Sequence, residues 1–313
     1  MKSRIFCGLG CLLTACITSN SCRKPDEHRC QPIPECQPIP ASNGPFGYEE
    51  ITAGRSVQSV SYNPNNDNEF VFWVRAEGPR PTPLWIDTLF VYNKATGEQR
   101  NILEGDLEWA AHWGKNGWIL FNSMNGIAMI KPNGDSLTII SREYSNATWN
   151  ASCTRIYAVA SYDRHMNVLL NLDGTVADSF QFGADDVDFI DDDRLLAGSV
   201  VFTISTRHYD TSNVDGWTGS RMISANEYIW FGYFAINKTN IFTRQTVKLK
   251  ETPCKSQVYL NPSVNGSKTK VLWRRITYRA DTCFGHKLFS NYDIVEMNTD
   301  GTGEQEISIP GDL

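Results

Sequence analysis

Few residues of this chain have catalytic potential, and none falls within a motif that defines a reaction. The sequence contains no Gly-x-Ser-x-Gly nucleophile elbow, no His-Glu-x-x-His zinc motif and no glycine-rich phosphate-binding loop. Glu108 and Asp188 both lie near the start of an expected strand, where they could form the carboxylate pair of a glycosidase. We therefore expect no catalytic residues, and a carbohydrate-active enzyme remains the alternative to a binding protein.

An acidic run from Asp185 to Asp193 offers the oxygen ligands that calcium prefers. It lacks the ordered Asp/Asn/Gly register of known calcium loops, and its second half falls in an expected turn. We interpret it as a solvated turn and expect neither a metal nor a cofactor. The net charge of -6 provides no basic footprint, so nucleic acid is not an expected partner.

Candidate binding residues gather in three long connections between expected strands, at about 76–87, 205–227 and 279–291. These connections combine arginine with aromatic residues, which is typical of interface hot spots and of stacking surfaces for sugars. The candidate binding face consists of Arg80, Trp85, Arg207, His208, Tyr209, Trp217, Arg221, Phe284 and His286. The alternative is that the three connections pack on one another and bury their own aromatic side chains.

The elements that must position these residues are β-strands. Apolar runs joined to a second strand by a short Asn/Asp/Gly/Thr turn recur at Leu89, Ile127, Val168, Gly232 and Asp293. Another pair of strands, containing an aromatic residue, precedes each of these hairpins. The repeating unit therefore has four strands, which is the composition of a propeller blade. We predict an all-β fold, a β-propeller of five visible four-stranded blades, with six as the alternative.

Parts of the repeats resemble a known unit, Trp-Ser-Pro-Asp-Gly-Lys followed by an apolar strand and Asn-x-Asp-Gly. The segments 62–65, 113–116 and 298–303 carry this likeness best. The unit is that of TolB-like (WD40-like) β-propeller repeats, and the resemblance covers nearly everything after residue 50. It implies a cell-envelope protein that binds an envelope partner. Together with the arginine and aromatic residues of the long connections, we expect that partner to be an envelope protein or a glycan. The main rival fold is a two-sheet sandwich, which does not predict the same four-strand unit in every repeat.

The TolB-like family usually closes with six blades, and the fourth repeat is long enough to conceal a second unit. We find only one pair of hairpins there and favour a single blade with a long insert. In a ring of five, the three long connections would then meet in one sector of one face. Binding commonly occurs on long loops held by a rigid scaffold. The segment Tyr48–Thr52 reads like an outer strand that joins the last blade and closes the ring.

Cysteine and asparagine side chains add further expectations. Cys254 and Cys283 both fall in the final repeat, and we expect a disulfide between them in an oxidising compartment. We expect Cys153 to be unpaired. The chain also contains Asn-x-Ser/Thr sequons, which we interpret as turn chemistry rather than glycosylation sites; they begin at Asn146, Asn150, Asn237 and Asn265.

The N-terminus has the features of a secretory signal peptide. Lys2 and Arg4 precede an apolar stretch over about 5–15 that is too short for a stable membrane span. Leu-Thr-Ala-Cys, ending at Cys16, resembles a bacterial lipobox. Ser-Cys-Arg-Lys-Pro-Asp-Glu, around Cys22, resembles the start of lipoproteins of the Bacteroidetes group, with charges that act as a surface-export signal. We expect lipid attachment at Cys16 or Cys22, the alternative being a plain cleaved signal peptide.

Three segments result. Residues 1–21 are the expected lipoprotein signal peptide, with cleavage before Cys16 or Cys22. Residues 22–45 contain Cys-Gln-Pro-Ile-Pro twice, and this proline spacing favours an extended polyproline linker. Residues 46–313 form the propeller. The expected location is the outer membrane of a Gram-negative bacterium, on its periplasmic or its surface side.

Overall fold

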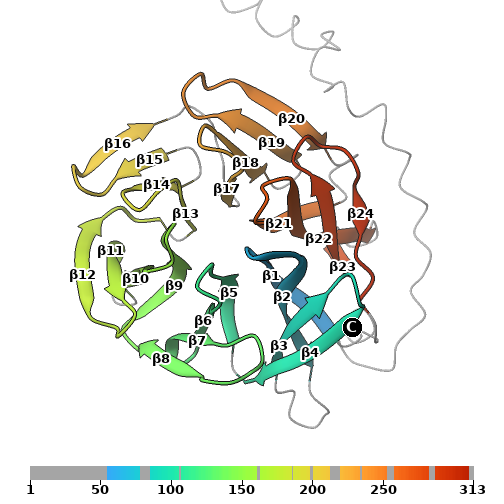
Figure 1. Ribbon diagram of the computed structural model, residues 1–313. Coiled ribbons are helices and arrows are strands. Elements are labelled where there is room, and N and C mark those ends of the chain that lie inside the picture. Colours follow the sequence, from blue (N-terminus) through green and yellow to red (C-terminus); the bar gives the residue numbers. More distant parts are fainter. Residues whose placement is uncertain are drawn as a thin grey trace, which may run out of the picture.

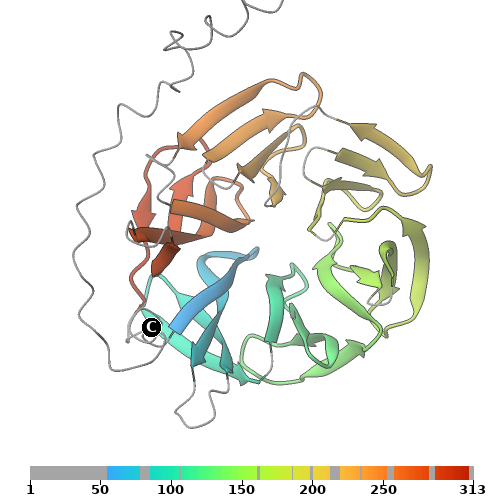
Figure 2. The same ribbon diagram turned by 180° about the vertical axis from the view of Figure 1, so that it is seen from behind.

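The computed structural model describes residues 55–77, 85–105, 107–160, 163–184, 186–197, 200–211, 219–232, 235–251, 257–281 and 286–309. In these ranges the chain forms six four-stranded antiparallel sheets, each a blade, which surround a central channel (Figure 1). The opposite face shows the same ring (Figure 2). The predicted all-β propeller is thus confirmed, with six blades. Within the described residues, no helix has the length and apolarity needed to cross a membrane.

The strands of each blade follow one another in sequence, and we call them A to D from the channel outward. Blades 1 to 3 contain β1 (Arg55–Asn63), β2 (Asn66–Glu77), β3 (Trp85–Asn93), β4 (Glu98–Glu104); β5 (Leu107–Trp113), β6 (Ile119–Ser123), β7 (Gly126–Ile130), β8 (Thr138–Ser141); β9 (Tyr144–Trp149), β10 (Arg155–Ala160), β11 (Asp163–Asn171) and β12 (Val176–Gln181). Blades 4 to 6 contain β13 (Asp188–Phe189), β14 (Arg194–Ala197), β15 (Val200–Thr203), β16 (His208–Thr211); β17 (Ser220–Met222), β18 (Glu227–Gly232), β19 (Ala235–Asn240), β20 (Thr246–Glu251); β21 (Gln257–Val264), β22 (Lys270–Asp281), β23 (His286–Asn298) and β24 (Gln305–Glu306).

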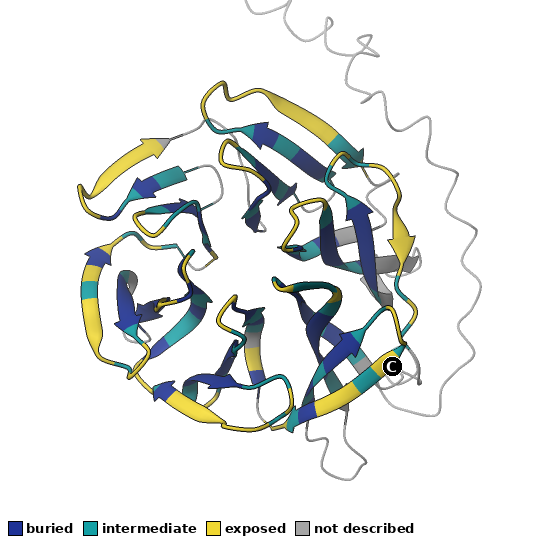
Figure 3. Ribbon diagram, viewed as in Figure 1, coloured by how far each residue is buried: buried dark blue, intermediate teal, exposed yellow. Residues whose placement is uncertain are grey.

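The hydrophobic core lies between the blades. Side chains alternate along a strand, so the middle strands of each blade have one apolar face toward each neighbouring blade. On β2, Val71 and Trp73 join a cluster with blade 2, whereas Phe70 and Phe72 join a cluster with blade 6. Clusters of the same kind fill the other seams, and exposed residues concentrate on the outer strands and turns (Figure 3).

The inner strands of neighbouring blades belong to different sheets and share no backbone ladder. Side chains connect them instead. A backbone N–H of one inner strand donates to a side-chain oxygen of the preceding blade. Examples are Tyr62 N to Ser263 Oγ (2.9 Å), Trp113 N to Ser61 Oγ (3.0 Å) and Met222 N to Asp188 Oδ2 (2.7 Å). These bonds satisfy backbone donors that the sheets leave unpaired.

The recurring turns between strands C and D hold successive blades together. Gly174, in the turn between β11 and β12, has a φ of 86°, and a Cβ there would lie 2.2 Å from the carbonyl oxygen of Ile140 on β8. Glycine is needed because the turn touches the outer strand of the preceding blade. Gly134 and Gly301 approach the outer strands of blades 1 and 5 in the same way.

The long insert that we favoured in the fourth repeat is instead the boundary between two blades. Segment 205–227 contains a C–D turn, β16, a connection and β17. The fourth blade is inconspicuous because its inner strand β13 covers only Asp188–Phe189. Its C–D turn also lacks the Asp-Gly signal, since Arg207 adopts the positive φ (55°) at which glycine is usual.

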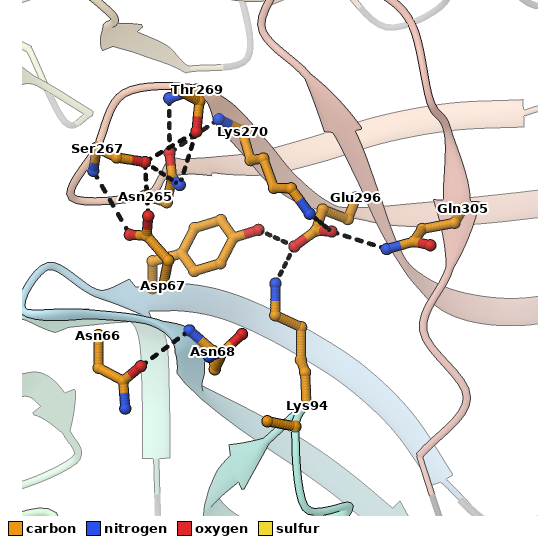
Figure 4. A network of polar contacts seen from close by, with 12 residues as sticks. Asn66, Asp67, Asn68, Lys94, Asn265, Ser267, Thr269, Lys270, Glu296 and Gln305 are labelled. Atoms are coloured by element: carbon orange, nitrogen blue, oxygen red, sulfur yellow. Dashed lines mark hydrogen bonds and ion pairs between the residues drawn. The ribbon is translucent and has the colours of Figure 1, made fainter.

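A buried acid closes the ring between blades 6 and 1 (Figure 4). Glu296 on β23 is 1% exposed and receives hydrogen bonds from Tyr62 and Lys94 of blade 1 and from Lys270 and Gln305 of blade 6. Burial alone would raise the pKa of Glu296, but the bonds from Lys270, Lys94 and Tyr62 lower it to about 2. The carboxylate is therefore charged and fully coordinated.

The C-terminal end adds a second contact to this seam. Ile307 and Ile309 pack against the cluster between blades 1 and 6, and the Tyr92 hydroxyl donates to the Ser308 carbonyl at 3.2 Å. Blades 1 and 6 are each built from consecutive strands. The predicted closing strand at Tyr48–Thr52 lies outside the described residues.

Candidate binding site in the central channel

The channel contains two hollows that open at opposite ends. The first, which we call the funnel, has a volume of about 550 Å³ and lies where the inner strands begin. It is lined by Gln58, Trp73, Arg75, Glu108, Ala110, His112, Asn122, Asn146, Ala147, Thr148, Asp186, Val187, Gly219, Arg221, Leu260, Asn261 and Arg274. The second, which we call the chamber, has a volume of about 400 Å³ and lies among the A–B turns. His112, Thr148 and Arg221 line both and form the waist between them.

β-Bulges shape the funnel. The pairing of the inner strand with its neighbour is irregular at Gln58 in β1, between Glu108 and His112 in β5, near Asn146 in β9 and near Asn261 in β21. A bulge adds a residue to one strand and redirects its side chain. Here the interruptions fall at one level of the channel, so their amide side chains line the funnel.

Asn261 has a φ of 54°, and Asn146 is unusual in the same way. Its φ is 51°, which is unfavourable for a non-glycine residue in a strand. Its buried Oδ1 accepts no hydrogen bond from the described protein atoms, which costs about 1–3 kcal/mol. Strain of this kind is typical of functional sites, where the surrounding structure holds a residue in an unfavourable conformation.

Two arginines of the funnel are fixed by the protein itself. Arg75 pairs with the buried Asp87 through two contacts of 2.8 and 3.0 Å, and its guanidinium lies 5.3 Å from the centre of the Trp73 ring. Arg274 donates to the carbonyl oxygens of Val57 and Gln58, both at 3.0 Å. These contacts hold both guanidinium groups in place before any ligand arrives.

The waist carries a neutral imidazole beside an ion pair. Burial lowers the pKa of His112 to about 4, and the nearby positive charge of Arg221 acts in the same direction. Arg221 pairs with Asp186 at 3.0 Å and donates to the Ser220 carbonyl at 2.7 Å. At neutral pH the waist therefore offers an uncharged imidazole and a compensated guanidinium.

The members of the predicted binding face whose side chains the structure describes lie in two places. Arg207 pairs with Asp178 of blade 3 at 2.7 Å, and the hydroxyl of Tyr209 on β16 donates to the Gln181 carbonyl. His208 also lies on this outer strand, far from the channel in the blade order. Of the described members, only Arg221 reaches the channel. The expected meeting of three inserts in one sector assumed five blades, whereas the ring has six.

Other predicted residues cannot be placed by their side chains. Trp85 and His286 begin β3 and β23, where the backbone alone is described. Residues outside the described ranges are Arg80, Trp217, Phe284, the expected disulfide partners Cys254 and Cys283, and the lipidation candidates Cys16 and Cys22. These expectations remain predictions. Cys153 is described as a free, buried cysteine.

The carboxylates proposed for a glycosidase face different spaces. Glu108 lines the funnel, whereas Asp188 lines the chamber and accepts the Met222 N–H at 2.7 Å. The second half of the acidic run has the turn role that we expected, whereas Asp186 pairs with Arg221 and Asp188 belongs to β13. Asp191 accepts a bond from Arg194, and Asp192 accepts the Asn150 amide at 2.8 Å. The sequon residues Asn150, Asn237 and Asn265 are buried, as turn and strand chemistry requires.

Sequence reasoning missed the amides that line the funnel. One signal was Pro262, which follows Asn261, because proline within an inner strand favours a bulge. Another was the spacing of the apolar residues Val57 and Val60, which breaks the two-residue alternation at Gln58. Their convergence could not be read from sequence, since it depends on ring closure.

Comparisons with known proteins bear on the fold. No protein-family model and no curated protein matches the chain. Among solved structures, a protein assigned as TolB from Agrobacterium tumefaciens is 12% identical, with 70% of this chain and 87% of that chain covered and a TM-score of 0.53. Regucalcin, a calcium-binding protein from the same organism, is 12% identical over 71% of this chain and 85% of its own, with a TM-score of 0.48. The β-propeller domain of the Trilobed protease from Pyrococcus furiosus is 7% identical over 82% and 84%, also with a TM-score of 0.48. The likeness to a TolB-like propeller is thus confirmed at the level of the fold.

Proposed function

We propose that this protein is a binding module of the cell envelope and that its ligand occupies the funnel. The observation that carries the proposal is the set of bulges at one level of the inner strands. They bring Gln58, Asn146 and Asn261 from three different blades to the wall of one cavity. The volume of about 550 Å³ lies within the range of about 300–1,000 Å³ that is usual for small-ligand sites.

The lining favours a glycan over a strongly charged ligand. An amide offers both donors and an acceptor, which matches hydroxyl groups that also donate and accept. The charges around the funnel largely compensate one another, because Arg75 pairs with Asp87 and Arg221 pairs with Asp186. His112 is neutral at physiological pH. We therefore infer that the ligand is a neutral sugar or the neutral end of an oligosaccharide.

The test is a binding measurement on the full chain with a panel of neutral and acidic oligosaccharides at constant ionic strength. We expect saturable binding of a neutral member by calorimetry. Asn261→Ala should weaken that binding about threefold to tenfold, which corresponds to one hydrogen bond. Asn133→Ala is the matched control, since Asn133 is an exposed amide of an outer turn. Binding that Asn261→Ala leaves unchanged, or binding of acidic members alone, would contradict the proposal.

Membrane tethering is the second part of the proposal, and the N-terminal sequence supports it. Cys16 and Cys22 each follow a recognisable lipoprotein pattern, and the proline-rich residues 22–45 would serve as the spacer. Metabolic labelling with a radioactive fatty acid should label the wild-type chain. We expect that either Cys16→Ser or Cys22→Ser abolishes the label while the other variant keeps it. Absence of label from the wild-type chain would contradict tethering. The proposal that the funnel binds a ligand would be unaffected by that result.

A further inference from the structure

The chamber differs from the funnel in its charge. It lies at the opposite end of the channel and has a volume of about 400 Å³. Lys115 comes from the A–B turn of blade 2, Arg221 from β17 and Lys268 from the A–B turn of blade 6. Asp188 supplies the one carboxylate in the described lining. Because Arg221 is paired with Asp186, the excess positive charge of the chamber comes from Lys115 and Lys268.

The nearby carboxylates are occupied elsewhere. Asp188 accepts the Met222 N–H, and Asp186, the partner of Arg221, lines the funnel rather than the chamber. On the surrounding turns, Asp67 and Asp192 accept hydrogen bonds from Ser267 and Ser152. Among the described side chains, neither chamber lysine forms an ion pair.

The positive groups of the chamber are close enough to influence one another. Lys268 belongs to an exposed turn, but its ammonium group reaches inward and donates to the Met222 carbonyl at 2.9 Å. Enclosure of that group lowers the pKa of Lys268, the charges of Lys115 and Arg221 lower it further, and Asp188 opposes them. An added anion would relieve this repulsion.

Hydroxyl groups in the same wall can complete an anion site. The Oγ atoms of Ser61 and Ser263 accept the N–H groups of Trp113 and Tyr62. A hydroxyl that accepts in this way retains its own O–H donor. Both serines line the chamber, so it combines ammonium, guanidinium and hydroxyl donors from different directions.

We propose that the chamber is a second binding site, specific for a small ligand with a phosphate group. A phosphate carries a charge of about -1.5 to -2 at neutral pH, whereas a carboxylate carries a single charge. The larger charge matches two lysines that lack carboxylate partners. A concave cavity of about 400 Å³ accommodates a free phosphate or a small phosphomonoester. The proposal does not rest on the identity of the funnel ligand, although Arg221 lines both hollows.

The test uses the full chain and inorganic phosphate, titrated at constant ionic strength with chloride as the compensating anion. We expect saturable binding by calorimetry. Lys268→Gln should raise the dissociation constant at least about tenfold, because a charged donor is lost. Lys115→Gln should act in the same direction. Lys248→Gln is the matched control, since Lys248 lies on the exposed outer strand β20 and pairs with Glu251.

Parallel titrations separate the candidate ligands. Glycerol 3-phosphate should bind at least as well as inorganic phosphate, and acetate should bind more weakly. Equal binding of acetate would overturn the assignment to phosphate. Binding to phosphatidic acid vesicles without binding of either soluble phosphate would overturn the assignment to a small ligand. An affinity that is unchanged in Lys268→Gln, with an unchanged melting temperature, would overturn the site itself.

Discussion

The funnel and the chamber are lined by the same inner strands, yet they present different chemistry. In the funnel, bulges within the strands supply amides, and the arginines are already paired or bonded to backbone carbonyls. In the chamber, the turns that follow those strands supply lysines that form no ion pair with any carboxylate the structure describes. One ring can therefore carry two sites of different selectivity, because strand interruptions determine one end and turn residues determine the other.

Two A–B turns show how a turn residue sets the chemistry. Blades 3 and 6 share the pattern Asn-x-Ser-x-Thr, beginning at Asn150 and Asn265. In each, the Asn side chain bonds the Ser and Thr hydroxyls and accepts two backbone N–H groups. The fourth position has a positive φ in both turns, 54° at Cys153 and 61° at Lys268. The turn geometry is thus constant, whereas that position is a buried thiol in one blade and a chamber cation in the other.

The largest effect should come from Glu296→Gln, which would weaken both ends together. The variant leaves Lys94 and Lys270 without their buried partner, and loss of one member of such a network costs about 3–5 kcal/mol. Urea unfolding should show a loss of that size in the free energy of unfolding, seen as a lower midpoint urea concentration. Binding in the funnel and in the chamber should then be lost in parallel as urea increases. Loss at one end alone would show that the two sites do not depend on the same ring closure.

Because of Glu296, we also expect the protein to lose stability at acid pH. Because the pKa of Glu296 is lowered from 4.5 to about 2, its contribution is present above the unfolded-state value and is lost as the pH falls from about 4.5 to 2. At about 1.4 kcal/mol per pKa unit, the loss amounts to about 3 kcal/mol. Unfolding measured across this range should slope less steeply in Glu296→Gln than in the wild-type protein. Parallel slopes would contradict the assigned role.

A smaller effect should distinguish the twin turns. Asn265→Ala and Asn150→Ala each remove a buried amide that accepts two backbone N–H groups, so each should lower stability by about 2 kcal/mol. Phosphate affinity should fall more in Asn265→Ala, since that turn carries Lys268. Calorimetry with inorganic phosphate compares them directly. Equal losses of affinity would mean that the residue at the fourth position does not distinguish the turns.

A change of opposite sign is expected in the funnel. Asn146→Gly removes a non-glycine residue with a φ of 51° and a buried unpaired oxygen, so it should stabilise the protein by about 1 kcal/mol. It should also weaken binding of the neutral oligosaccharide. Ser136→Gly is the control, because Ser136 has a φ of 61° in an exposed outer turn. If Asn146→Gly gained stability and kept its full affinity for the oligosaccharide, Asn146 would not contribute to binding in the funnel.

The smallest effect at neutral pH should come from the waist. Burial lowers the pKa of His112 to about 4, so the unfolded chain takes up a proton at a higher pH than the folded one. The contribution of the neutral imidazole is present above about 6.5 and is lost as the pH falls toward 4. In His112→Asn, the free energy of unfolding should depend less steeply on pH between about 6.5 and 4. Its slope above pH 7 should match that of the wild-type protein. A difference confined to neutral pH would contradict it.

The propeller could be predicted because most of its hairpin turns contain the Asn, Asp and Gly residues that tight turns favour. Segments such as 298–303 contain the residues that a tight turn needs, so the hairpins could be recognised one by one. The boundary between blades 4 and 5 was hidden because Arg207 takes a glycine-like conformation and β13 is very short. Neither site could be predicted, since Lys115 and Lys268 meet only when the ring closes.

The glycine contacts between blades give the molecule a direction of assembly. Gly134, Gly174 and Gly301 each rest on an outer strand that comes earlier in the chain. During synthesis, which begins at the N-terminus, each outer strand is therefore complete before the turn that docks on it has been made. Among the described residues, the seam around Glu296 joins the first and the last blade. That seam can form only after the last blade has been made, so the channel that contains both proposed sites is completed in one step.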